Sequence, residues 1–196
     1  MIISQTYLRI PQEELVISPG ESAARLMAER GYTSPLISEC ERELRSHVSC
    51  AFCAIRVKAE YPAEDEIDLG FVSCKSHDLY RNLLGSREAF VFAVTLGIEV
   101  DRLILKLSRL SPARHFITDA LASAMAEAAC DRTDNILSSG LICRPRFSPG
   151  YGDLPLSLQP EVIRATGADR RLGITLSSSL LMTPKKSVTA IKGIIK

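Results

Sequence analysis

The chain has 196 residues, of which 46% are hydrophobic and 24% are charged. This balance suits a globular protein that buries its own core without disulfides or metal ions, and we expect a single domain over residues 1–196. The formal net charge of +1 argues against a general nucleic-acid binder or membrane-surface binder, because both classes normally carry a strong basic excess.

The beginning of the sequence also bears on where the protein acts. Its first ten residues, MIISQTYLRI, lack the charged and apolar regions of a secretion signal, and no apolar run approaches the length of a membrane span. We therefore expect a cytoplasmic protein that does not enter a membrane. In that compartment its six cysteines are expected to be reduced thiols.

The first predicted elements follow from local signals. A short strand is expected at residues 7–10. The segment 18–21, SPGE, combines an N-cap serine, a first-turn proline and a capping-box glutamate, which predicts a helix that ends at Gly31. Ser34-Pro35 opens another helix, and its apolar face carries Leu36, Ile37, Cys40 and Leu44.

Cys50 and Cys53 form a C-x-x-C motif inside a segment that alternates as a strand. Residues three apart on a strand face opposite sides, so this pair cannot share a zinc ion. A thioredoxin-like pair would stand at a helix N-terminus instead. We predict buried, reduced and metal-free cysteines here. The three histidines lie on separate predicted helices, and we assign no catalytic residue and no metal ligand.

Residues 51–59 and 66–73 alternate apolar side chains with polar or small ones, and an acidic segment connects them. They predict an antiparallel hairpin with one buried face. Ser76 then caps a short helix that ends at Gly85. The apolar run at 89–96 is typical of a strand covered on both faces, and an amphipathic helix follows it after Gly97.

Ser111-Pro112 begins the longest predicted helix, which runs to about Leu137 and stops by Gly140. Alanine and serine residues between 120 and 129 keep this helix thin, so we expect it to be central. Glu127 shares a stripe of the helix with small and apolar residues. Its carboxylate is either paired, as burial would require, or lies at the edge of the stripe and reaches water.

The segment 141–155, LICRPRFSPGYGDLP, follows this helix. Pro149-Gly150 predicts a type II turn flanked by Ser148 and Tyr151. Such a loop directs backbone N–H groups to a common point, and Arg146 adds a planar fork of donors that can grip a carboxylate. The residues alone leave two interpretations, a small-anion cradle or a surface turn with a solvated arginine.

After this segment we expect a short helix from Leu158 to Thr166 that ends at Gly167. The remaining residues alternate well enough to predict two final strands, joined near residues 183–186.

The spacing R-x-x-x-G-Y, here Arg146, Gly150 and Tyr151, resembles the S-adenosylmethionine-binding signature of the activation domain of cobalamin-dependent methionine synthase. Segment 120–128 with its glutamate resembles the long alanine-rich helix of that family, and segment 173–188 resembles its closing strands. These matches occur in the family's order within residues 112–196. The resemblance implies an α+β fold with a mostly antiparallel sheet and a long central helix rich in alanine.

In this family, the domain binds S-adenosylmethionine in a shallow groove and presents the methyl group to the cobalt of a cobalamin on a neighbouring domain. Oxidised cobalt is thereby reduced by one electron and methylated. The resemblance implies that Arg146 holds the carboxylate of the ligand, and that Glu127 meets its positively charged end or braces the loop. The implied ligand site comprises Glu127, Arg146, Ser148, Pro149, Gly150 and Tyr151.

The chain departs from the family after Tyr151, where Gly152-Asp153-Leu154-Pro155 replaces the P-A-C-P of the family. It also ends before a tyrosine-bearing segment that helps to cover the ligand in the family, and its first half has no match. The cobalamin- and substrate-binding domains are absent from it. We therefore expect a stand-alone subunit that acts in trans on a cobalamin-binding methionine synthase or another corrinoid protein.

Cobalamin is expected only on that partner, and a flavodoxin-like protein is the expected electron donor. One alternative is a non-catalytic binding or assembly module of the same fold that has lost S-adenosylmethionine binding. Another is a thiol or zinc protein built on the C-x-x-C motif.

Overall fold

The computed structural model describes residues 2–18, 25 and 34–195. Its centre is an antiparallel sheet of four strands in the order β1-β2-β5-β8. The strands are β1 (Ile2–Arg9), β2 (Ala51–Lys58), β5 (Glu88–Thr95) and β8 (Ser187–Ile194). The first and last strands of the chain, β1 and β8, thus belong to the same sheet and stand at opposite ends of its strand order. The helix expected between Ser18 and Gly31 lies outside the described residues.

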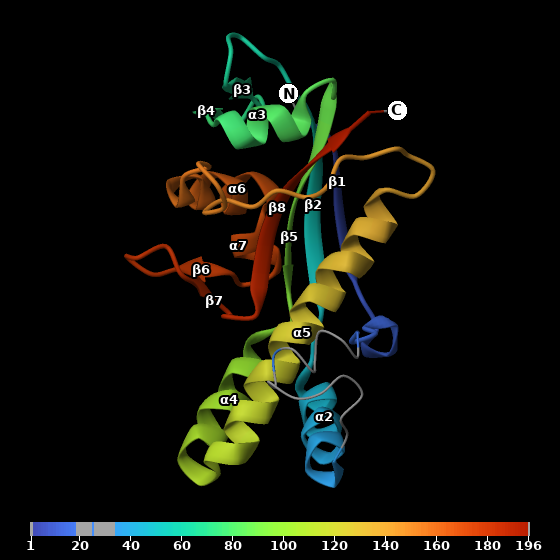
Figure 1. Cartoon of the computed structure of the whole chain (residues 1–196), viewed down its shortest axis with the longest axis vertical. Coiled ribbons are helices and arrows are strands. Elements are labelled where there is room, and N and C mark those ends of the chain that lie inside the picture. Colours follow the sequence, from blue (N-terminus) through green and yellow to red (C-terminus); the bar gives the residue numbers. More distant parts are fainter. Residues whose placement is uncertain (1, 19–24, 26–33, 196) are drawn as a thin grey trace.

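Helices cover both faces of this sheet (Figure 1). The long helix α5 (Pro112–Leu137) packs on one face, where Phe52 and Phe92 meet Met125. On the other face, α6 (Gln159–Thr166) brings Val162 against Ile55. Because successive side chains of a strand point to opposite faces, both faces of β2 and β5 carry buried residues. The expectation of a doubly covered strand at 89–96 is confirmed, as is the central alanine-rich helix.

The predicted hairpin between residues 51–59 and 66–73 is wrong. Strand β2 pairs with β1 and β5. Strands β3 (Glu66–Asp68) and β4 (Ser73–Lys75) pair with each other in a separate two-stranded sheet. The reason is burial, since β2 is apolar on both faces and therefore takes an interior position with a strand on each side. Strand β1 is also longer than expected, because its first residues, IISQT, do not alternate apolar with polar side chains, and Ile2 and Ile3 are exposed.

The helix starts that the capping residues Ser34, Ser76 and Ser111 predicted are confirmed. Helix α2 (Pro35–His47) begins with Ser34, whose Oγ accepts the Ile37 N–H at 3.3 Å. The Oγ of Ser76 accepts the Leu79 N–H at 3.1 Å and caps α3 (His77–Leu83). Ser111 Oγ caps α5, which follows α4 (Ile98–Leu110). Helices α2 and α4 and the first half of α5 form one end of the molecule, and α3 lies at the other (Figure 1).

Short elements complete the fold: the 3-10 turns η1 (Gln12–Glu14) and η2 (Leu156–Leu158), helix α7 (Ala168–Arg171), and strands β6 (Thr175–Leu176) and β7 (Met182–Thr183). Strands β7 and β8 flank residues 183–186 as expected, but they do not pair with each other. Strand β7 pairs with β6, and β8 pairs with β5. None of the described helices has the length and apolar character needed to cross a membrane.

The outer edge of β8 pairs with the segment that leads into the 146–151 loop. The Arg144 N–H donates to the Gly193 carbonyl at 2.8 Å, and the backbones of Phe147 and Ile191 exchange two hydrogen bonds, each of 2.8 Å. These bonds place the loop beside the sheet, next to the last turns of α5.

Candidate functional site

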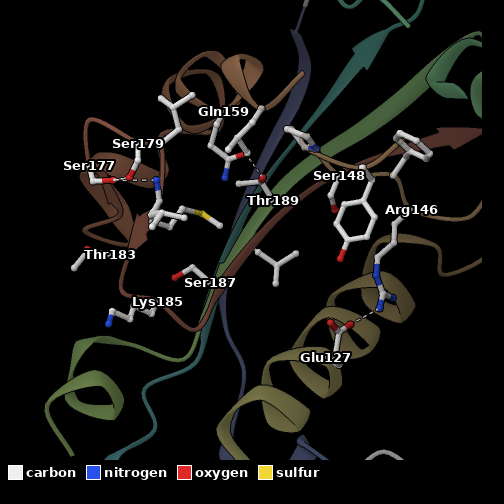
Figure 2. A pocket seen from close by; sticks show the side chains of 18 residues that line it. Glu127, Arg146, Ser148, Gln159, Ser177, Ser179, Thr183, Lys185, Ser187 and Thr189 are labelled. Carbon is white, nitrogen blue, oxygen red and sulfur yellow. Dashed lines mark hydrogen bonds and ion pairs between the residues drawn. The ribbon is translucent and has the colours of Figure 1, made fainter. Parts of the chain in front are cut away.

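A groove of about 960 Å³ opens between the 146–151 loop and the hairpin formed by β6 and β7 (Figure 2). Helix α5 contributes to one side of it, and β8 runs between the loop and the hairpin. The groove is lined by five of the six residues that the sequence predicted for the ligand site, namely Glu127, Arg146, Ser148, Pro149 and Tyr151. The sixth, Gly150, forms the turn between two of them.

The turn at Pro149-Gly150 has the predicted geometry. The Tyr151 N–H donates to the Ser148 carbonyl at 3.1 Å, and Gly150 has a φ of +89°. A type II turn requires positive φ at its third residue, which glycine accepts without strain. The Gly150 N–H also donates to the Leu154 carbonyl at 2.9 Å, so the turn is closed on both sides. The Tyr151 residue is 67% exposed and lies at the rim of the groove.

The Arg146 guanidinium joins this loop to α5. Its Nη2 donates to Glu127 Oε2 at 3.0 Å, and its Nη1 donates to Asp131 Oδ1 at 2.7 Å and to Asp134 Oδ2 at 3.4 Å. The prediction that Glu127 lies within hydrogen-bonding reach of the loop is confirmed (Figure 2). The side chain of Arg146 is only 28% exposed, so the alternative of a solvated arginine is wrong.

The charges around Arg146 keep it protonated. Burial by itself lowers the pKa of the Arg146 guanidinium, but the hydrogen bond to Asp131 and the surrounding charges outweigh burial and raise the pKa above its ordinary value. Glu127 is paired with Arg146, yet its side chain remains 37% exposed and lines the groove. Its carboxylate therefore combines the two alternatives drawn from the sequence, since it is paired and still reaches water.

Acidic side chains surround Arg146 at this end of the groove, which does not favour the small-anion cradle, one of the two interpretations drawn from the sequence. Asp134 also forms an ion pair with Lys192, whose Nζ lies 3.0 Å from Asp134 Oδ2; the two side chains are 15% and 11% exposed, respectively. Three carboxylates, those of Glu127, Asp131 and Asp134, thus face the two cations Arg146 and Lys192, which leaves a charge of −1. A third cation, Arg25, lies 3.8 Å from Glu127 and brings the sum to zero.

Both terminal nitrogens of Arg146 donate to protein carboxylates, so a carboxylate clamp on a ligand would have to use the N–H groups that these bonds leave. Arg146 fastens the loop to the helix and orients Glu127. A contact between Arg146 and a ligand stays a prediction. The three carboxylates stand at positions 127, 131 and 134, on one face of α5, and this helical spacing is a signal that could have revealed the arrangement from the sequence.

The opposite side of the groove was not assigned from the sequence. Its lining includes Gln159 from α6 and residues of the β6–β7 hairpin and of β8. The Gln159 Oε1 accepts a hydrogen bond from Thr189 Oγ1 at 3.0 Å, and both residues are buried. Within the hairpin, Ser177 Oγ accepts the Leu181 N–H at 3.1 Å. Gln159 begins α6 and lies on its buried face with Val162, Ile163 and Thr166. A polar side chain on an otherwise mostly apolar helix face is the signal that could have indicated a role for Gln159.

The backbone of β8 adds hydrogen-bonding groups to the groove. The N–H and C=O of Ile191 both point to the outer edge of the strand, where they pair with Phe147. In an antiparallel strand every second residue repeats that direction. The N–H and C=O of Thr189 therefore point to the same edge, and Thr189 lines the groove. A ligand in the groove can find a backbone donor and a backbone acceptor side by side.

The C-x-x-C cysteines lie away from this groove. Cys50 packs in the cluster on the α5 face of the sheet. Cys53 lies on the other face, opposite Ala93, where the charges of Arg171 and Asp169 on α7 are close enough to affect the pKa of its thiol. The prediction that the two thiols face opposite sides is confirmed. Burial raises the pKa of Cys50 to about 12 and that of Cys53 to about 11. Across the described part of the chain, no three histidine, cysteine or acidic side chains gather as a metal site.

Comparisons with known proteins agree with this architecture. Neither a protein-family model nor a curated protein matches the sequence. Among solved structures, the chain is similar to the crystal structure of the MetH reactivation domain bound to AdoHcy, with a TM-score of 0.74 and 12% identity. The match covers 97% of this chain and 78% of that chain. The chain therefore has the fold of the MetH reactivation domain, an α+β fold with an antiparallel sheet and a long helix.

Proposed function

We propose that the groove binds S-adenosylmethionine and that the chain supports reductive methylation of cobalamin held by a separate methionine synthase or another corrinoid protein. One observation carries this proposal. Residues of the R-x-x-x-G-Y signature and Glu127 line a single groove, in a chain whose fold is that of a domain solved with AdoHcy.

The polar groups of the groove suit the two ends of this ligand. S-adenosylmethionine carries a sulfonium, an ammonium and a carboxylate, so its net charge is positive. Glu127 would face the positive groups, and Arg146 would hold Glu127 and the loop in place. The backbone of Thr189 and the hydroxyl groups of the β6–β7 hairpin would meet the ribose and adenine. These contacts position the ligand, which is the main contribution that a methyl transfer from an activated donor requires of a binding domain.

Cobalamin would come with the partner protein, and a flavodoxin-like protein would supply the electron. A second candidate is the binding or assembly module that no longer holds S-adenosylmethionine. It is favoured by one observation, the engagement of both terminal nitrogens of Arg146 by protein carboxylates. The two functions differ in whether the isolated chain, or the chain with its partner, binds S-adenosylmethionine.

Calorimetry with S-adenosylmethionine and S-adenosylhomocysteine tests this difference. The wild type should bind, and Arg146→Ala should weaken binding by roughly 10-fold to 100-fold, because it removes charge-assisted bonds that hold the loop. Arg146→Lys should recover only part of the loss, since an ammonium cannot reproduce the planar fork. Arg109→Ala is the matched control, because Arg109 is exposed in the last turn of α4, far from the groove.

Activity in trans is tested with a corrinoid protein whose cobalt is in the Co(II) state. With a reductant and S-adenosylmethionine present, adding the chain should convert the cobalamin absorption spectrum to that of the methylated form. If the wild type binds no S-adenosylmethionine even with a cobalamin-loaded partner, the proposal fails and the assembly module takes its place.

A further inference from the structure

We infer that Asp153 is a positioning residue, whose carboxylate fastens the groove loop to the start of α3 and so holds the Pro149-Gly150 turn in shape. Its effect on ligand binding rests on the proposed function. The fastening itself is a property of the free protein and can be measured without a ligand.

The fastening consists of hydrogen bonds in both directions. The carboxylate of Asp153 accepts the Ser76 hydroxyl, the His77 N–H at 2.7 Å and the Asp78 N–H at 3.2 Å. In return, the Asp153 N–H donates to Asp78 Oδ2 at 3.2 Å. One surface residue thus joins two segments that are about 75 positions apart in the sequence.

The backbone of Gly152 lies close to the side chain of Asp78. A Cβ atom on Gly152 would stand 2.2 Å from Asp78 Oδ2 and 3.0 Å from its Cγ, so the Asp78 carboxylate would have to move away from the position in which it binds the Asp153 N–H. Glycine at this position therefore allows the loop to approach α3 closely enough for the bonds of Asp153 to form.

Leu154 connects Asp153 to the Pro149-Gly150 turn through hydrogen bonds. This neighbour of Asp153 is buried in the cluster on the α6 face of the sheet. Its carbonyl accepts the Gly150 N–H at 2.9 Å, and its N–H donates to the Tyr151 carbonyl at 3.0 Å. Movement of Asp153 would displace Leu154 and with it the two hydrogen bonds that Leu154 makes to Gly150 and Tyr151 of the loop.

The ionisation state of Asp153 suits this role. The Ser76 hydroxyl and the backbone N–H groups of His77 and Asp78 bind the charged form and lower the pKa of the Asp153 carboxyl, against a smaller opposing effect of desolvation. Asp153 therefore carries its charge at neutral pH. Two further titratable side chains lie beside it, Asp78 and His77, the latter with Nδ1 at 2.8 Å from Asp65.

The loop is thus held at both ends. Arg146 binds it to α5 at one end, and Asp153 binds it to α3 at the other. A loop that is already ordered gives up less conformational entropy when a ligand binds. The second anchor uses Gly152 and Asp153, the positions at which the sequence departs from the family it resembles. At those positions this chain uses a hydrogen-bonded aspartate to fix the course of the loop.

Amide hydrogen exchange and calorimetry test the inference on full-length Asp153→Ala and Asp153→Asn. In the free protein, Asp153→Ala should speed exchange of the Gly150 and Leu154 amides by about 10-fold, because the closed turn opens more often. Asp153→Asn keeps one acceptor oxygen and should show a smaller increase. Asp169→Ala, an exposed change on α7, should show none. Unchanged exchange within α5 would verify that each variant is folded.

Binding of S-adenosylmethionine should weaken in the same order, by about 3-fold to 10-fold for Asp153→Ala. If neither Asp153 variant changes the exchange of Gly150 and Leu154, the fastening is refuted. If exchange quickens but the affinity of both variants equals that of the wild type, Asp153 is structural and has no positioning role. If the wild type does not bind S-adenosylmethionine, the proposed function and the positioning role fail together, and exchange alone decides the fastening.

Discussion

Replacing Gly150 by alanine would put a side chain where the groove turn has a φ of +89°. Positive φ costs a residue with a Cβ about 1 to 2 kcal/mol. The new Cβ would also stand 3.2 Å from Leu156 Cδ1, the end of a flexible side chain that is 38% exposed and can move aside. We therefore expect backbone strain to account for most of the loss, a total of about 1 to 2 kcal/mol.

Gly140→Ala provides a matched control. Gly140 has a φ of +74°, a Cβ there would meet nothing within 4 Å, and it follows α5 outside the groove lining. Both variants should lower the melting temperature by about 2 to 8 °C, as a strain of this size predicts for a chain of this length. Gly150→Ala alone should also weaken S-adenosylmethionine binding, by roughly 5-fold to 30-fold if the strain displaces the turn. Gly150→Val should be at least as harmful, because a β-branched residue resists positive φ more strongly.

Differential scanning calorimetry and ligand titration on the two variants separate the possibilities. A Gly150→Ala protein that melts like the wild type would show that the turn does not hold the conformation described. A destabilised Gly150→Ala protein with unchanged affinity would show that the turn lies outside the ligand site. Equal losses of affinity in both variants would point to general destabilisation and refute the assignment of a local effect.

The buried ion pair and the buried thiols can be tested by urea unfolding. Lys192→Met should lower the free energy of unfolding by about 3 kcal/mol, since it leaves the carboxylate of Asp134 with only the 3.4 Å contact to Arg146. Adding Asp134→Leu should restore much of the loss, and a single variant within 1 kcal/mol of the wild type would contradict the reasoning. Burial raises the pKa values of Cys50 and Cys53, so these thiols ionise first in the unfolded chain. Their contribution to stability is full below pH 9 and falls as the pH rises to about 11 for Cys53 and to about 12 for Cys50. Each thiol contributes up to about 1.4 kcal/mol per pH unit, and Cys53→Ala should show a shallower decline than the wild type; equal slopes would overturn this.

The features predicted well were those with local causes. Ser34, Ser76 and Ser111 begin helices because each side chain accepts an N–H three residues later, which depends on a few adjacent residues. The turn at Gly150 is similar, since proline and glycine restrict φ at their own positions. The R-x-x-x-G-Y spacing then located one side of the groove.

The features missed depend on partners far away in the sequence. Pairing of Ala51 with Arg9 on one side and with Thr95 on the other decides that β2 is an interior strand, and alternation within residues 51–59 carries no information on that choice. The far side of the groove was missed for the same reason, because Gln159 and Thr189 meet only after α6 has packed on the sheet. The contacts of Arg146 with Asp131 and Asp134 likewise form only where the loop folds back onto the last turns of α5.

The pairing of residues 142–147 with β8 has a consequence for solubility. A β-strand with an open edge can recruit strands from other molecules, and here the edge of β8 from Ile191 onward is occupied by the segment that carries the groove loop. Any change that frees this segment would uncover the backbone groups of Ile191 and Gly193 together with apolar neighbours. Selection for a well-formed groove and selection against aggregation therefore act on the same hydrogen bonds. Loop variants with weakened binding are expected to be those that precipitate first at high concentration.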